Sequence, residues 1–409
     1  MPRRHCAATA PKPAVAGRNL SGTNLERAGD HNQRVTLHAI RVSGPVTRTD
    51  LVLITGLTAA AIANITNRLL RQRLIVKAGT IRGGRGQPAV KFAINPDSCY
   101  SLGLNVDRDH ITLVLVDFAG KVRARLSREV SFALPDAVQA FVLRTARQLL
   151  DRARVSPGRL VGLGVAFPDD IQRSALPNQP PEYTAWGSAS LERLLSSLLP
   201  VPIFLENDAA AAAIGEMHFG LGQRYQSFFY ILITAGLGGG LVVDGHYVRG
   251  ASGRSGEPGL LPAHNTGDGT RTLQSVVSIS MINELLAARG LRVSSPRRLT
   301  QLEATEQPIV DRWIDESVEA LEPTLVSVDC LINPEATLIG GRLPAPLVER
   351  LAQCLNERRR TYKPIIPSVA PIARAALSAD APAVGAAILP FTNRFLPTRL
   401  ALMKNPNER

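Results

Sequence analysis

Cysteine is scarce in this sequence and is never closely paired. The four cysteines, Cys6, Cys99, Cys330 and Cys354, stand far apart, and no CxxC motif occurs. This spacing argues against a zinc site built from clustered cysteines. It is typical of free thiols in a reducing compartment, so we expect a cytoplasmic protein.

Long apolar runs are also missing. The sequence has no stretch of eighteen apolar residues, and its longest apolar-looking runs, 209–214 and 228–233, are far too short to span a bilayer. Residues 1–31 lack the apolar segment of a secretory signal and have no apolar periodicity. The sequence therefore predicts a flexible N-terminal tail and no membrane partner.

Acidic residues are nearly absent from residues 32–96. This stretch has ten Lys or Arg residues and a single acid, Asp50, which gives it a net charge of +9 out of +13 for the whole chain. Positive charge concentrated in this way is typical of a nucleic-acid-binding module. Charge alone is equally compatible with an inert basic surface, so the pattern of turns and apolar residues within the stretch has to decide.

The turn residues of this stretch predict two short helices separated by a tight turn. Thr47 and Thr58 are suited to cap the starts of the two helices, and Gly56 between them can adopt a positive φ. The expected buried face of the first of these helices is Leu51, Leu53 and Ile54. Two short helices joined by a glycine-containing turn form a helix-turn-helix.

The second of these helices is the predicted reader of DNA. Small side chains near its start would let it approach base edges, Asn64 could pair with adenine, and Arg68 could reach a phosphate or a base. Two strand-like runs follow, and the glycine-rich tip between them carries Arg82 and Arg85, which could contact a phosphate or the minor groove. A nucleotide-binding loop is the alternative, but no GK[ST] follows the tip. The predicted DNA contacts are Arg48, Thr58, Ala60, Ala61, Asn64, Arg68, Arg82 and Arg85.

The rest of the chain alternates strand-like and helix-like segments, which indicates an α/β fold. Glu206-Asn207-Asp208 stands at a strand end, where its amide and carboxylates would suit sugar hydroxyls and Asp208 could act as a general base. The triplet could instead serve only as a helix cap. Residues 234–240 form a glycine-rich loop that could cradle a phosphate or be a plain hairpin turn. Residues 255–259 place Glu257 in a second glycine-rich loop.

In order and spacing these motifs resemble the ROK family, which is named for repressors, open reading frames and kinases. Residues 206–216 are similar to the family's "ENDANAAALGE", residues 234–240 to "GTGIGGG", residues 256–257 to the start of "GEIGH", and residues 333–341 to "NPExIVLGG". Residues 44–57 resemble the "GPxxRxxL…TGL" opening of the repressor branch, and residues 84–88 resemble its "GRGRP" wing. The resemblance covers about residues 32–395.

This resemblance implies an N-terminal winged helix-turn-helix followed by a two-lobed, actin-like (ribonuclease H-like) α/β domain. The implied boundaries are a tail at 1–31, a DNA-binding domain at 32–96, a ROK domain at 97–395 and a tail at 396–409. Within the ROK domain, the first lobe is expected at 97–205 together with a C-terminal helix at 380–391. The second lobe is expected at 206–375, and a sugar cleft separates the two lobes.

The sequence departs from the kinase branch of the family at its phosphate-binding hairpin. Family kinases carry "DxGGTK" there, whereas residues 105–111 read Asn-Val-Asp-Arg-Asp-His-Ile and have no glycine. Asp107 and Asp109 are expected to face the position of the ATP phosphates and to repel them. The comparison therefore predicts a protein that is not an enzyme and needs no cofactor, although Asp208 is retained.

The zinc motif of the family is also missing. The family's histidine ligand is replaced by Leu260, and residues 264–274 contain no cysteine, so no metal is expected. The glutamate that contacts the sugar in the family is Gln274 here. By resemblance, the sugar-binding residues are Asn207, Asp208, Glu257 and Gln274, and Phe167 is expected to narrow the floor of the cleft.

Together these features predict a cytoplasmic transcriptional regulator, most simply a repressor. We expect it to bind double-stranded operator DNA and a small sugar effector, as a homodimer or a dimer of dimers on palindromic half-sites. Two alternatives stay open. One is a ROK-type sugar kinase with Asp208 as catalytic residue; the other is a constitutive DNA-binding protein whose ROK domain only dimerises.

Overall fold

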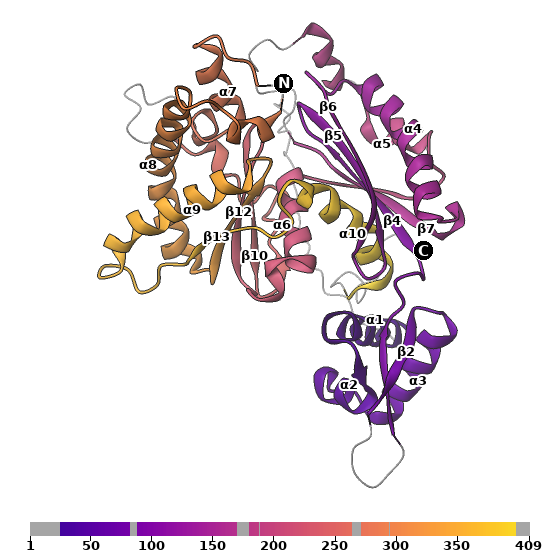
Figure 1. Ribbon diagram of the computed structural model, residues 1–409. Helices are drawn as coiled ribbons and strands as arrows, with labels where there is room; N and C mark the ends of the chain where they lie inside the picture. The colour runs from indigo at the N-terminus through magenta and orange to yellow at the C-terminus, as the bar shows by residue number, and fades with distance from the viewer. Residues whose placement is uncertain are drawn as a thin grey trace, which may run out of the picture. The chain divides into compact units, whose positions relative to one another are not determined.

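The computed structural model describes residues 25–81, 88–169, 180–187, 189–263, 271–293 and 295–397. The chain divides into two compact units, which are labelled by element in Figure 1. One unit contains the residues up to Ile94 together with those from Phe395 onward, and the other is Asn95–Arg394. Each unit is described by itself below.

The first unit consists of three helices and a small sheet. Its helices are α1 (Leu25–Ser43), α2 (Arg48–Thr55) and α3 (Ala59–Arg71), and its strands are β1 (Val46–Thr47), β2 (Ile75–Ile81) and β3 (Ala89–Ile94). The strands pair in the order β1-β3-β2, and both pairings are antiparallel. The segment that joins β2 to β3 falls outside the described residues.

The predicted turn chemistry between α2 and α3 is confirmed. The Thr47 hydroxyl accepts a hydrogen bond from the backbone N–H of Asp50, whose carboxylate accepts one from the N–H of Thr47, so α2 begins with a complete capping box. Gly56 ends α2 with a φ of 70°, and Thr58 caps α3 by accepting from the N–H of Ala61. The sequence thus fixes where both helices begin and how the chain turns between them.

Two expectations for this unit are wrong. Leu51 is fully buried, but Leu53 is 79% exposed and Ile54 is 50% exposed, because an eight-residue helix turns only one narrow stripe towards the core. The predicted tail also ends too late, since α1 already begins at Leu25. Local contacts within α1, such as the ion pair between Arg34 and Asp30 at 2.8 Å, support this first part of the helix.

The second unit contains two five-stranded sheets of the same design. The first sheet has the order β6-β5-β4-β7-β8, built from β4 (Tyr100–Val106), β5 (His110–Asp117), β6 (Val122–Glu129), β7 (Leu160–Ala166) and β8 (Ile203–Glu206). The second has the order β11-β10-β9-β12-β13, built from β9 (Phe228–Ile233), β10 (Leu237–Val243), β11 (His246–Tyr247), β12 (Ala336–Gly341) and β13 (Ile372–Arg374). In each, three antiparallel strands are followed by two parallel ones. The predicted α/β class with two lobes is confirmed.

Helices separate and cover the two sheets. In the first lobe, α4 (Pro135–Ala153) and α5 (Leu191–Ser196) pack their apolar residues on one face of the sheet. On the other face lies α10 (Ala381–Phe395), as Figure 1 shows. A Cβ on Gly164 of β7 would lie 1.7 Å from the backbone oxygen of Ala386, so this close approach requires glycine. A helix is therefore present where the C-terminal helix was expected at 380–391, and it runs from Ala381 to Phe395.

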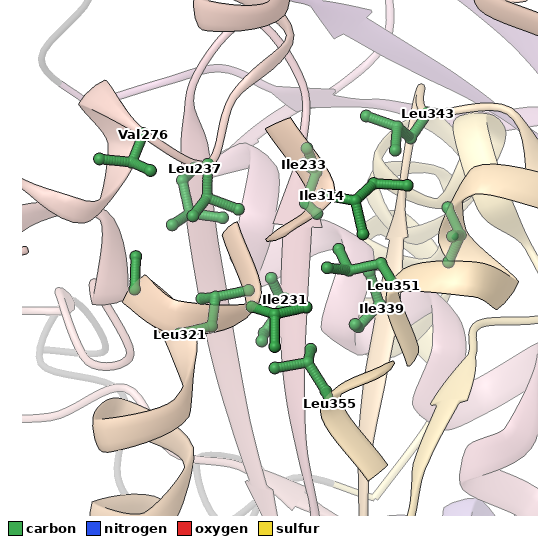
Figure 2. Close-up of a cluster of buried hydrophobic side chains, with 14 of the residues drawn as sticks. Ile231, Ile233, Leu237, Val276, Ile314, Leu321, Ile339, Leu343, Leu351 and Leu355 are labelled. Carbon is green, nitrogen blue, oxygen red and sulfur yellow. The ribbon is translucent and has the colours of Figure 1, made fainter. Parts of the chain in front are cut away.

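The largest core belongs to the second lobe. Figure 2 shows Ile231 and Ile339 from the sheet beside Ile314, Leu321, Leu351 and Leu355 from the helices that cover it. Those helices are α8 (Gln307–Ile332) and α9 (Ala345–Arg359), with α7 (Ile279–Ala287) alongside. The opposite face of the same sheet packs on α6 (Asp208–Phe219). This packing holds the start of α6, which directly follows β8, in a fixed position beside the second sheet.

No single described helix is long and apolar enough to cross a membrane. The helices α2 and α3 meet the length and composition criteria only when they are added together across a bend of 115°.

Candidate functional site

The outward face of α3 carries the side chains predicted to read DNA. Four of them, Thr58, Ala60, Asn64 and Arg68, are exposed, and Ala61 is half-buried. The opposite face is anchored by three fully buried residues, Ile62, Thr66 and Leu69. The helix is therefore fixed on one side and presents a mostly small, polar and basic surface on the other.

The surface near α3 is richer in cations than the prediction recognised. Arg71, Arg73 and Lys77 are also exposed. Asp50 is occupied in the cap of α2, where hydrogen bonds from the backbone and hydroxyl of Thr47 lower the pKa of its carboxyl. The only acid between residues 32 and 96 thus serves the helix terminus.

Arg48 is held within the first unit. Its Nε donates to the hydroxyl of Thr66 at 2.9 Å and its Nη2 donates to Oδ1 of Asn67 at 2.7 Å. Its guanidinium carbon also lies 5.4 Å from the centre of the Phe92 ring. These contacts tie α2 to α3 and β3, a structural role that the sequence did not reveal. A direct contact of Arg48 with DNA stays a prediction.

A groove runs between α1 and α3, and it contains residues that the sequence reasoning missed. Its lining includes Asn64 and Arg68, as predicted, together with Asn32, Gln33, Asn67 and Arg71. Asn67 and Arg71 follow Asn64 and Arg68 at helical spacing, a signal that would have found them. Arg82 and Arg85, the predicted contacts of the hairpin tip, lie outside the described residues.

In the second unit, the four predicted sugar-binding residues line one cavity of about 80 Å³. Asn207 and Asp208 follow β8, and Asp169 follows β7, so they meet at the carboxyl edge of the first sheet. Glu257 and Gln274 come from the second lobe. The motifs that are scattered through the sequence are thus brought together.

Asn207 has two roles. Its Oδ1 accepts hydrogen bonds from the backbone N–H groups of Ala209 and Ala210 at 2.9 and 3.1 Å, which caps α6. Its Nδ2 donates to Asp169 at 3.2 Å at the cavity wall. Asn207 therefore caps α6, and its side chain also reaches the cavity.

Asp208 carries a strongly perturbed carboxyl in this cavity. Its pKa is raised to about 7, first because the group is removed from bulk solvent and then because Asp107 and Glu257 add negative charge nearby. The backbone N–H of Ala209 donates to it at 2.8 Å and offsets part of this rise. A carboxyl with a pKa near neutrality can accept or release a proton at physiological pH.

Arginines that the sequence did not single out also line the cavity. Arg254 has one guanidinium nitrogen 3.8 Å from Asp169 and another 3.7 Å from Glu257. Arg108 and Gln274 both lie beside Gly236, 3.6 and 3.5 Å from where a Cβ on that glycine would be. The cavity therefore offers both donors and acceptors to a polyhydroxylated ligand.

The glycine-rich loop at 234–240 is mostly strand. Gly238, Gly239 and Gly240 belong to β10 and pair with β9. A Cβ on Gly238 would lie 2.8 Å from that of Ala209, and one on Gly240 would lie 2.6 Å from that of Ala213, so the glycines allow α6 to pack closely. Of the two sequence interpretations, this geometry favours the hairpin over a phosphate cradle.

The hairpin turn at residues 107–110 places its two carboxylates in different surroundings. Asp107 is buried and lines the cavity, but the Asp109 carboxylate accepts a hydrogen bond from Arg342 of the second lobe and lies 3.3 Å from Nδ1 of His110. The charge of Asp109 is thus largely compensated, and Arg108 adds a cation to the cavity. Asp109 lines a neighbouring cavity together with Arg108 and Ala235. The expectation that both carboxylates face the position of an ATP phosphate stays a prediction.

Phe167 does not line the cavity. Its ring packs against Trp186, with ring centres 4.9 Å apart, and the next two residues, Pro168 and Asp169, line the cavity instead. Leu260, which replaces the family histidine, also lines it. Residues 264–270 lie outside the described part of the chain, so the expected absence of the family's zinc site stays a prediction.

Comparison with known proteins agrees with this architecture. A xylose repressor from Bacillus spizizenii (strain ATCC 23059 / NRRL B-14472 / W23) is 29% identical over 231 residues, which are 56% of this chain and 59% of that protein. The matched region thus spans well under two thirds of that relative.

Solved structures share the fold. One titled as a ROK family transcriptional regulator, homolog of the E. coli MLC protein, has a TM-score of 0.64 at 22% identity and covers 89% of this chain and 96% of that one. A ROK hexokinase from Thermus thermophilus has a TM-score of 0.52 at 25% identity and covers 71% and 97%. The model of the ROK family matches residues 101–392. The chain belongs to the ROK family.

Proposed function

We propose that the protein is a DNA-binding transcriptional repressor whose ROK domain responds to a sugar or sugar derivative. The observation that carries the proposal is the presence, in one chain, of a segment of net charge +9 with an exposed α3 face and of a ROK cleft. In this proposal residues 32–96 are the DNA-binding domain. Residues 97–395 are the ROK domain, with lobes at 97–205 plus 380–391 and at 206–375.

The first unit has the proportions of a winged helix-turn-helix. Its helices α2 and α3 meet at 115° across Gly56, within the range of about 90–120° that is usual for this motif. The β2–β3 hairpin would be the wing. We place α3 in the major groove, with Asn64 and Arg68 near bases or phosphates, and Arg82 and Arg85 at the backbone or minor groove.

The cleft supports a small polyhydroxylated effector. Asn207, Asp208, Glu257 and Gln274 offer amide and carboxylate groups of the kind that bind sugar hydroxyls. Xylose is the first sugar to test, since a relative is named a xylose repressor. Binding that closes the lobes would change the spacing of two DNA-binding domains in a homodimer or dimer of dimers, and so shift the population away from the operator-binding form.

The decisive experiment has two steps. Genome-wide mapping of the DNA bound in cells identifies the operator, and fluorescence anisotropy then measures the affinity of the full chain for that duplex with and without a panel of pentoses and hexoses. We expect the cytoplasmic protein to bind its operator tightly, and one sugar of the panel to weaken this binding. Failure to bind DNA at low ionic strength contradicts the proposal; binding that no sugar changes leaves only the constitutive alternative.

A sugar kinase is the second candidate. It is favoured by Asp208, whose pKa of about 7 suits a general base, and by the shared fold of a ROK hexokinase. The substituted turn at 107–110 and the hairpin geometry of residues 234–240 oppose it. A coupled assay with ATP, magnesium and the same sugars tests it, and turnover that Asp208→Asn abolishes would establish it.

A further inference from the structure

The β4–β5 turn of the first lobe concentrates polar groups at the edge of the sugar cleft, which Asp107 also lines. Asp107, Asp109 and His110 each present one ligand atom, and these three atoms all lie within 4.8 Å of one another. Asp107 is only 2% exposed and His110 only 3% exposed, so water reaches neither freely. Burial at this level makes an uncompensated charge costly.

Two buried oxygens at this turn lack partners. Oδ2 of Asp107 and Oδ1 of Asn105 have no hydrogen bond within the described part of the chain, and Asn105 is 2% exposed. The Asp107 oxygen lies 3.6 Å from Nδ1 of His110, so it faces into the group of three. A buried carboxylate oxygen in this position calls for a cation.

The charge balance of the cluster points the same way. Three carboxylates, those of Asp107, Asp109 and Glu129, stand against one guanidinium, that of Arg342, which contacts Asp109 and Glu129. The Arg108 guanidinium lies nearby, beside Gly236, and offsets part of this charge. With a neutral imidazole the carboxylates still outnumber the guanidinium groups, and a divalent cation would compensate the remaining negative charge.

We propose that Asp107, Asp109 and His110 bind a divalent transition-metal ion, with Zn²⁺ or Mn²⁺ as the best fit to one imidazole nitrogen and two carboxylate oxygens. Nδ1 of His110 is 3.3 Å from Oδ1 of Asp109 and 3.6 Å from Oδ2 of Asp107. Atoms that share an ion at about 2.0–2.2 Å lie at such separations. This site is separate from the cysteine-containing zinc motif of the ROK family, which residues 264–274 lack.

Neighbouring side chains complete the site. Nε2 of His110 lies 3.1 Å from Nδ2 of Asn105, and turning the Asn105 amide over would let its unpartnered Oδ1 accept the Nε2–H. Nδ1 then keeps a free lone pair for the ion, an arrangement common in metal-bound histidines. Arg342 can remain, because a carboxylate has about four lone-pair positions for its partners.

The test uses the purified full chain, stripped with a chelator, reloaded with Zn²⁺ or Mn²⁺ and desalted. We expect about one ion per chain by mass spectrometry of the metal content and a higher Tm than in the stripped protein. Asp107→Asn and His110→Gln should lose at least tenfold in metal affinity. The matched controls Asp151→Asn and His246→Gln, at exposed positions, should bind as the wild type does.

Cobalt gives a readout that does not depend on the variants folding. Co²⁺ in the proposed site should give visible d–d bands but no thiolate charge-transfer band in the near ultraviolet, because no thiolate is among the ligands. An intense thiolate band in the near ultraviolet, metal binding that His110→Gln leaves unchanged, or a wild-type chain that holds less than about a tenth of an ion would each overturn the proposal. Because DNA is absent from every arm, failure here is distinct from failure of the proposed repressor function.

Discussion

At the scale of single residues, the ionisation of Asp208 connects the fold to the chemistry of the cleft. Its carboxyl is placed by the α6 terminus, where Ala209 donates to it, and lies close to Asp107 and Glu257. Removal of Asp208 from solvent, and then the negative charge of Asp107 and Glu257, make the folded state favour the proton. The sequence predicted Asp208 as a site residue, but the neighbours that set its pKa come from distant parts of the chain.

We predict that Asp208 makes the folded state less stable as the pH rises. The folded pKa of about 7 exceeds the usual value of 3.8, so the folded chain binds the proton more tightly between these values. The resulting stability is full below pH 4 and is lost as the pH rises through 7, by at most about 4 kcal/mol and by less after solvent screening. The measurement is urea unfolding of the wild type and of Asp208→Asn at several pH values.

The informative quantity is the difference between the two proteins, because other groups titrate in both. That difference in unfolding free energy should fall between pH 4 and pH 7 and then level off. A difference that stays constant across this range would mean that Asp208 has an ordinary pKa.

At the scale of elements, one face of α3 is exposed for DNA binding and another holds the helix in place within the first unit. Arg68 is exposed on its outer face, whereas Arg48 of α2 bonds to Thr66 and Asn67 on α3. Both are arginines of a basic segment, and no sequence pattern distinguishes their roles. Only the packing of two helices at 115° brings Arg48 against α3.

We therefore predict opposite phenotypes for two alanine variants. Arg68→Ala should weaken operator binding by about 1–3 kcal/mol and leave stability nearly unchanged. Arg48→Ala should lower the unfolding free energy of the first unit by about 1–3 kcal/mol, because it removes two hydrogen bonds and a ring contact. Anisotropy and thermal unfolding of the two full-length variants, side by side, make the comparison. Equal losses of stability in both would contradict this division of roles.

The contact between α10 and β7 makes a second prediction at this scale. Gly164→Ala should destabilise the second unit by more than about 3 kcal/mol, because the new Cβ would meet the backbone oxygen of Ala386 at 1.7 Å. Gly158→Ala is the control, since a Cβ there meets nothing within 4 Å. Thermal unfolding of both variants tests this, and two identical melting curves would show that α10 does not pack as described.

Local chemistry explains which elements the sequence could predict. Caps at Thr47 and Thr58 and the turn at Gly56 depend on neighbours within a few residues, and these were confirmed. The exposure of Leu53 depends on which stripe of α2 packs on the core, and the pairing of Asp109 with Arg342 depends on a partner far along the chain; both were missed. Family motifs pointed to the four residues that line the cavity, whereas Arg108, which departs from a motif, and Arg254, which the quoted motifs do not include, were not singled out.

At the scale of the whole molecule, charge is divided unequally along the chain. Residues 32–96 carry +9, and the remaining residues share the rest of +13. A chain built in this way should bind DNA with strong salt dependence, because each neutralised phosphate releases counterions. If six to ten phosphates are contacted, operator affinity should fall by about 10³- to 10⁵-fold between about 50 and 200 mM salt.

A salt titration of operator anisotropy measures that slope. Arg71→Ala, which removes an exposed cation of α3, should reduce it by about one. Arg297→Ala, at an exposed position in the second unit, is the control and should leave the slope unchanged. Binding that is indifferent to salt would place the contact with DNA elsewhere than on the basic unit.

The coupling of the cleft to DNA binding makes the last prediction, and thermodynamics fixes its form. If a sugar lowers operator affinity by a given factor, the operator must weaken sugar binding by the same factor, and a tenfold effect corresponds to about 1.4 kcal/mol. Calorimetry measures the affinity for the effective sugar with and without saturating operator, and so gives the factor by which the operator weakens sugar binding. Asp208→Asn should abolish the sugar effect while operator affinity without sugar stays as in the wild type, since Asp208 belongs to the second unit. Unequal factors would mean that the sugar acts on a different species from the one that binds DNA. A fall in the operator affinity of Asp208→Asn without sugar would mean that Asp208 supports DNA binding through the fold rather than through the ligand.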